Sequence, residues 1–209
     1  MGNSRPASLR GRGPAITIAH RVAVALLCSF CGCAAGESEP SEPAGSGVGA
    51  FAPNGLIVQV GRTSNATTLG LGLQWNWSRS WRLGEHGRLS GYNNVLLGRW
   101  RVDDGASAIV TQVGFTPAFR FWPRSAAHGW FFEGGIGANW LTPLYRTRDK
   151  RFSTAFNFGD HLAVGHRSAL LGWEWSLRVQ HFSNAGIREP NPGENFVQLR
   201  LVVPLGGDA

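Results

Sequence analysis

Hydrophobic and polar residues alternate along several stretches of the chain after residue 51. In residues 67–77 the odd positions from Leu69 to Trp77 carry Leu or Trp, and the even positions carry Thr, Gly, Gln or Asn. A period of two places successive side chains on opposite faces of a β-strand. The stretch also matches the length of a tilted strand that crosses a bilayer, and it is longer than most strands of soluble sandwiches.

The same alternation recurs elsewhere and predicts about eight strands. It is clear in residues 130–140, 171–179 and 197–203, and weaker near residues 55–62, 87–100, 109–122 and 153–165. Eight is the smallest strand number of bacterial outer-membrane barrels. We therefore expect an all-β fold, an eight-stranded antiparallel outer-membrane β-barrel over residues 53–209, with Leu and Trp facing lipid. Parity does not decide which face lies outside, so a soluble lipocalin-like barrel is the alternative.

The first 35 residues have the layout of a secretory signal peptide. Basic residues precede an uncharged run at residues 22–30, and small residues follow up to Ala35. That run is too short to span a bilayer. Residues 36–52 are rich in Ser, Pro, Glu and Gly, so we expect a flexible linker. The three cysteines all precede the expected cleavage site, and lipidation of Cys33 is an alternative form of processing.

Composition and charge support this interpretation. The chain has 29 Gly and 9 Trp, with 16% charged residues, which is unlike a coiled coil, a helical bundle or a disordered tail. The formal net charge of +7 suggests a nucleic-acid partner at first. Four of the arginines belong to the predicted signal, however, and without them the charge falls to about +3. We therefore expect no nucleic-acid partner.

Residues 179–195 contain the best candidate for chemistry. His181 and Ser183 are two positions apart on a predicted strand, so their side chains share a face and an imidazole can take the hydroxyl proton. A triad also needs a carboxylate to orient the His, and Glu194 follows after a turn rich in Pro, Gly and Asn. Glu189, within that turn, is the rival acid. The candidates for groups that hold an oxyanion are Asn184, Gly186 and Asn191.

Strand parity places this pair on an unusual face. His181 and Ser183 continue the apolar odd-numbered face of residues 173–179, which faces lipid in a membrane barrel. Polar groups are costly there, and a substrate that is itself a membrane lipid explains them. Glu194 has the even parity of the lumen-facing set, so it reaches His181 only if the last strand begins later or contains a bulge.

The segment from His181 to Ile187, with Pro190–Gly193 after it, closely resembles the signature of the lipid A 3-O-deacylase (PagL) family. The similarity extends over residues 58–201 and includes the stretches 73–77, 116–120, 133–138 and 152–161. It implies an eight-stranded barrel in the outer membrane of a Gram-negative bacterium. It also implies hydrolysis of the ester-linked 3-hydroxyacyl chain at position 3 of lipid A in lipopolysaccharide, without a metal or another cofactor.

The resemblance also implies roles for individual residues. His181 would be the general base, Ser183 the nucleophile and Glu194 the orienting acid of a Ser-His-Glu triad. Asn191 and Gly186 would be the oxyanion donors, with Asn184 as a supporting polar group. Whether the barrel forms a homodimer is left open. A non-enzymatic structural or lipid-binding small β-barrel is the competing function.

Further polar residues are expected to have structural roles. Asp160 and His161 are interpreted as part of a network at the rim or in the lumen, because two residues do not make a metal site. The charged residues with lumen parity are expected to pair with one another inside a narrow barrel; they are Glu133, Glu174, Arg178 and Arg200.

Overall fold

The computed structural model describes residues 52–103, 109–124 and 126–206. The predicted signal peptide, nearly all of the predicted linker and Cys33 lie outside this part of the chain. Within it, no helix has both the length and the apolar character needed to cross a membrane. The described chain is almost entirely strand and connecting loops.

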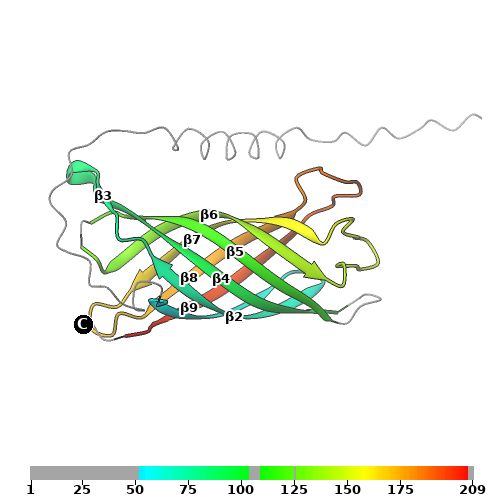
Figure 1. Ribbon diagram of the computed structural model, residues 1–209, viewed down its shortest axis with the longest axis horizontal. Coiled ribbons are helices and arrows are strands. Elements are labelled where there is room, and N and C mark those ends of the chain that lie inside the picture. Colours follow the sequence, from blue (N-terminus) through cyan, green and yellow to red (C-terminus); the bar gives the residue numbers. More distant parts are fainter. Residues whose placement is uncertain (1–51, 104–108, 125, 207–209) are drawn as a thin grey trace, which may run out of the picture. The chain divides into compact units, whose positions relative to one another are not determined.

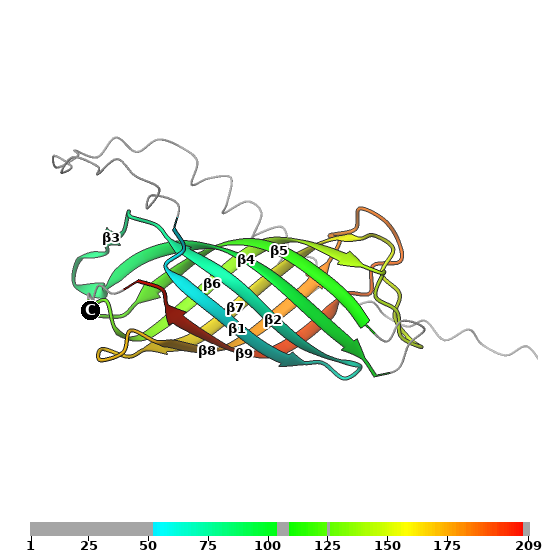
Figure 2. The ribbon, with the colours of Figure 1, turned by 60° about the horizontal axis from the view of Figure 1, so that its bottom comes forward.

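Nine strands form one antiparallel sheet that closes on itself (Figures 1 and 2). Strand β1 pairs with both β2 and β9, and β2 pairs with β4. The two-residue β3 pairs only with the start of β4, so the other eight strands complete the ring. A 3₁₀ turn, η2 (Gly84–His86), precedes β4. The strands are β1 (Gly55–Arg62), β2 (Ala66–Asn76), β3 (Trp81–Arg82), β4 (Arg88–Val102), β5 (Ile109–Trp122), β6 (Gly129–Thr142), β7 (Phe156–Arg167), β8 (Glu174–Ser183) and β9 (Glu194–Pro204).

This closed barrel confirms the predicted fold class, and all eight predicted strand regions contain a strand. The largest difference is at β8, where Leu171 and Trp173 continue the alternation but lie in the turn before the strand. Apolar alternation alone does not mark the end of backbone pairing, because a turn residue can also point toward lipid. Within the strands, by contrast, the alternation predicts which residues face outward and which face the lumen.

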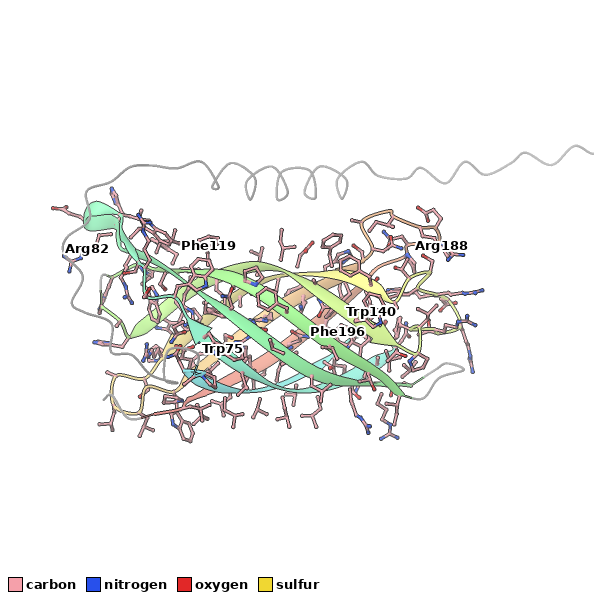
Figure 3. The ribbon with its side chains drawn as sticks, in the orientation of Figure 1. Trp75, Arg82, Phe119, Trp140, Arg188 and Phe196 are labelled. Carbon is pink, nitrogen blue, oxygen red and sulfur yellow. The ribbon has the colours of Figure 1, made fainter. Side chains whose placement is uncertain are left out.

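The alternation separates an apolar exterior from a polar interior. Leu69, Leu71 and Leu97 on neighbouring strands expose more than half of their side chains, whereas Gln74 and Asn94 are buried. Exposed tryptophans lie near the strand ends, for example Trp140 in Figure 3. An apolar band with aromatic residues at its borders is typical of a barrel that spans a membrane. The reversed arrangement of a soluble lipocalin-like barrel does not occur here.

Paired charges fill the middle of the lumen, as expected. The Arg120 guanidinium contacts the carboxylates of Glu133 and Glu174, both at 2.9 Å. Arg178 also contacts Glu133, at 2.6 Å. Arg200 differs from the expectation, because it donates to Gln74 Oε1 at 2.7 Å. Buried charges are tolerated when each has partners, so this network acts as a structural core.

Toward the end of the barrel that carries the β8–β9 loop, aromatic side chains form a buried cluster in the lumen. Trp100 lies at its centre, with ring centroids 4.8 Å from Phe182 and 4.7 Å from Phe196. Tyr145 and Phe152, from the loop between β6 and β7, pack onto the same cluster. The cluster anchors the ends of β8 and β9, where the candidate site residues lie.

Candidate active site

His181 and Ser183 lie at the end of β8, where the barrel wall meets the loops. Both point outward, because the intervening Phe182 points into the aromatic cluster. On the same face of β8, Leu177 and Val179 lie closer to the middle of the barrel and expose about half of their side chains. The pair therefore lies at the border of the apolar band, where an embedded lipid would place its headgroup. Ser183 is only 4% exposed and lies directly opposite Phe158 of β7.

The partner of the His181 ring is Asn195. His181 and Asn195 are directly opposite on β8 and β9, and His181 Nδ1 lies 2.7 Å from Asn195 Oδ1. An amide oxygen can only accept a hydrogen bond, so Nδ1 carries the proton in this contact. The neutral ring then keeps a lone pair on Nε2, which is the atom a general base uses.

Glu194, the expected orienting acid, is 2% exposed, and its carboxylate lies on the lumen side of the wall. β9 begins at Glu194 without a bulge and pairs it with the inward-facing Phe182. The carboxylate accepts hydrogen bonds from Thr63 Oγ1 at 2.7 Å and from Tyr145 OH at 2.8 Å, and Lys150 Nζ lies 3.0 Å away. Burial and this carboxylate raise the pKa of the Tyr145 hydroxyl, which keeps it a donor. Glu194 therefore connects the start of β9 with the β1–β2 and β6–β7 loops on the lumen side.

The rival acid, Glu189, belongs to the turn between β8 and β9. Its Oε2 accepts the backbone N–H of Asn191 at 3.0 Å. This is a local hydrogen bond within the β8–β9 loop, two residues apart. The structure thus brings neither expected carboxylate to Nδ1 of the imidazole.

The three expected oxyanion residues organise the β8–β9 loop. The amide of Asn184 donates to Ser153 Oγ at 3.0 Å and to the carbonyl of Arg188 at 2.7 Å, which uses both of its hydrogens. The Gly186 N–H donates to Asn184 Oδ1 at 2.9 Å. Asn191 Oδ1 accepts the backbone N–H of Asn184 at 3.0 Å. Of this set, the side-chain amide of Asn191 is the donor for which the described residues supply no hydrogen-bond partner.

Gly193 fits closely against the His181 ring. Its φ of +65° is a left-handed conformation that favours glycine, and a Cβ built there would lie 2.6 Å from His181 Cε1. It would also lie 3.2 Å from Nε2. The absence of a side chain at Gly193 thus lets the loop approach the Cε1–Nε2 edge of the imidazole.

Asp160 and His161, which are adjacent in sequence, lie on opposite sides of the barrel wall. His161 faces the lumen with Nε2 3.6 Å from Glu133, in agreement with the expected network. Asp160 faces outward and is directly opposite His181 across β7 and β8. Directly opposite residues of antiparallel strands place their Cβ atoms about 4.5–5.5 Å apart. His181 therefore lies in a cross-strand row between Asp160 and Asn195.

Two residues of this row, Asn195 and Asp160, were not among the site residues expected from the sequence. Asn195 has the odd, outward parity of Val197 and Leu199, and this parity was the available signal. Asp160 could be recognised as a neighbour of His181 only once the register between β7 and β8 was known. Together, a hydroxyl, an imidazole with a fixed proton and nearby amides form a site suited to acyl transfer from an ester.

Comparison with known proteins gives an independent view of the chain. A family model described as lipid A 3-O-deacylase (PagL) matches residues 67–204. A lipid A deacylase PagL from Bordetella bronchiseptica is 39% identical over 127 residues, which are 59% of this chain and 66% of that protein. A lipid A deacylase PagL from Pseudomonas aeruginosa is 32% identical over 148 residues, 70% of this chain and 83% of that protein.

One solved structure is similar along nearly its whole length. The crystal structure of the outer membrane enzyme PagL aligns with a TM-score of 0.64 and 30% sequence identity. The alignment covers 72% of this chain and 99% of that chain. The residues matched by the family model run from β2 to the end of β9 and include the loop between β8 and β9.

Proposed function

Because the chain belongs to the lipid A 3-O-deacylase (PagL) family, we propose that it removes the 3-hydroxyacyl chain at position 3 of lipid A in lipopolysaccharide. Its place of action is the outer membrane of a Gram-negative bacterium. The observation that carries the proposal is the outward-facing pair of His181 and Ser183 at the border of the apolar band. A hydrolytic site on this face meets a substrate that lies in the membrane.

In the proposed mechanism Ser183 is the nucleophile and His181 the general base. Ser183 Oγ attacks the ester carbonyl carbon, and its proton passes to His181 Nε2. The bond from that carbon to the sugar oxygen then breaks, and the imidazolium returns its proton to the sugar oxygen. The imidazole next takes a proton from water, and the hydroxide attacks the acyl-serine carbonyl. The bond to Ser183 Oγ breaks, the imidazolium returns the proton to Oγ, and the 3-hydroxy fatty acid is released. Asn191 uses its side-chain oxygen within the loop, so we assign its amide N–H group the role of oxyanion donor.

The competing function, a non-enzymatic structural or lipid-binding barrel, makes a different prediction. Such a barrel needs the apolar exterior and the loops but no nucleophile. Its properties would therefore be insensitive to removal of the Ser183 hydroxyl, whereas an esterase requires it.

The test is release of 3-hydroxy fatty acid from purified lipid A by the protein in detergent micelles. We expect Ser183→Ala to lose about 10³-fold or more of kcat, because it removes the attacking oxygen. The heat-modifiable migration of the folded barrel on gels should stay at the parental temperature, because the substitution removes one small atom. Release at the parental rate by the variant would exclude Ser183 as the nucleophile.

A further inference from the structure

We propose that the neutral amide of Asn195, and not a carboxylate, positions His181, so that the site is a Ser-His-Asn triad. The inference deepens the proposed function and rests on it for the identity of the ester. It concerns a positioning residue, since Asn195 acts on the substrate only through the imidazole. Its basis is the 2.7 Å contact between His181 Nδ1 and Asn195 Oδ1.

The geometry gives Asn195 the task that an aspartate has in serine proteases. A triad needs an acceptor on Nδ1 that fixes the tautomer and the ring orientation, and Asn fills this position beside the catalytic His of papain-like proteases. The contact joins residues that are directly opposite on β8 and β9, so it is fixed by backbone register. Phe182 and Phe196, the inward neighbours of His181 and Asn195, anchor both strands in the aromatic cluster.

Glu194 is held in a different task by its own contacts. Three side chains from two loops bind its carboxylate, which is 2% exposed and lies on the lumen side of the wall. To reach His181, the side chain would have to cross its own strand and leave Lys150 and Tyr145 without their acceptor. Leaving such groups unpaired is costly. Glu194 thus joins loops on the lumen side of the wall, and Asn195 orients the general base on the outer side.

A neutral orienter does not balance the positive charge that His181 acquires during the reaction. Asp160, directly opposite on β7, is the carboxylate whose register places it beside the ring. Of the other charged groups around the site, Glu189 accepts from the turn backbone and Arg188 belongs to the same loop. Glu194 and its partner Lys150 lie behind the wall. We therefore assign the stabilisation of the imidazolium to Asp160, while Asn195 sets its orientation.

The experiment measures activation of Ser183 with a fluorophosphonate probe, so that it needs no lipid substrate. In the labelling step a bond forms between Oγ and phosphorus, fluoride leaves, and the hydroxyl proton passes to His181. We expect Asn195→Ala to slow labelling roughly 10- to 100-fold, Asn195→Asp to remain within about tenfold of the parent, and Glu194→Gln to change it only a few-fold. Val197→Ala, the next outward position on β9, is the matched control for folding.

The pH profile separates positioning from a merely structural role. A carboxylate at position 195 favours the protonated ring, so the acidic limb of the Asn195→Asp labelling profile should move to higher pH. Asp160→Asn should move the same limb to lower pH, because it removes a negative charge. A structural defect would lower the rate without shifting the limb.

Several outcomes would overturn the proposal. They are parental labelling by Asn195→Ala, an Asn195→Asp rate as low as that of Asn195→Ala, or a loss in Glu194→Gln that exceeds the loss in Asn195→Ala. Failure of the proposed function is distinguishable from all of these. In that case Ser183 of the parent is labelled at the expected rate and the variants follow the expected order, but no 3-hydroxy fatty acid leaves lipid A.

Discussion

At the scale of single residues, the site depends on a glycine, which has no side chain, as well as on polar side chains. Gly193 allows the β8–β9 loop to approach the His181 ring, with a left-handed φ of +65°. Gly193→Ala would place a methyl group 2.6 Å from His181 Cε1 and add backbone strain of roughly 1–2 kcal/mol. The ring or the loop must then shift from its present position.

We therefore expect Gly193→Ala to reduce kcat/KM for lipid A deacylation by about tenfold or more, measured on the purified protein. The matched control is Gly129→Ala, which also has a positive φ but has no atom within 4 Å of the added carbon. It should keep the parental activity. If Gly193→Ala is as active as the Gly129→Ala control, close packing against His181 is not needed for catalysis.

At this scale, the sequence predicts some features of the site and leaves others undetermined. The shared face of His181 and Ser183 is predictable from their spacing, because a strand places residues two apart on one face. The partner of His181 is not, because Glu194 and Asn195 differ by one position, and a one-residue difference exchanges lumen and exterior. The carboxylate has the chemistry expected of a triad, but the amide has the correct parity.

At the scale of elements, the aromatic cluster holds the strands that carry the site. Phe182 lies between His181 and Ser183 in sequence and is fully buried against Trp100 and Phe196. Its large side chain fixes the direction in which both functional neighbours point. The order of the site therefore depends on the packing of the aromatic cluster.

Phe182→Ala should lower the free energy of unfolding by about 3–5 kcal/mol, the usual cost of a large cavity, and should also lower kcat. Denaturant titration in lipid vesicles measures the first effect, and release of 3-hydroxy fatty acid the second. Phe132→Ala is a suitable control, since that ring is 54% exposed on the exterior of β6 and lipid can fill the space. Equal stability losses in the two variants would contradict a role for the cluster as an anchor.

The loops could not be deduced in the way the strands could. Strand alternation reflects a repeated local choice between lipid and lumen, so it is visible in the sequence. The contact of Ser153 with Asn184 and Arg188 instead joins two loops that are distant along the chain. Such contacts depend on the closed ring of strands, and they explain why Asn184 and Gly186 serve loop order.

At the scale of the whole molecule, the barrel reverses the arrangement of a soluble protein. Ion pairs around Glu133 fill the lumen, and Leu, Val and Trp cover the outside. Buried charges need partners, and a ring of eight strands is narrow enough for Arg120 and Arg178 to reach the same carboxylate. With the lumen filled, the proposed site uses the outer wall, where the proposed substrate is a neighbouring lipid.

The most direct test of this account is mass spectrometry of lipid A extracted from Gram-negative cells that express the protein. Expression of the parent should reduce the mass of lipid A by one ester-linked 3-hydroxyacyl chain, with the loss assigned to position 3 by fragmentation. Cells that express equal amounts of folded Ser183→Ala should retain the full mass. Unchanged lipid A in the parental cells, or the same loss with Ser183→Ala, would contradict the central claim that this outward-facing serine hydrolyses lipid A.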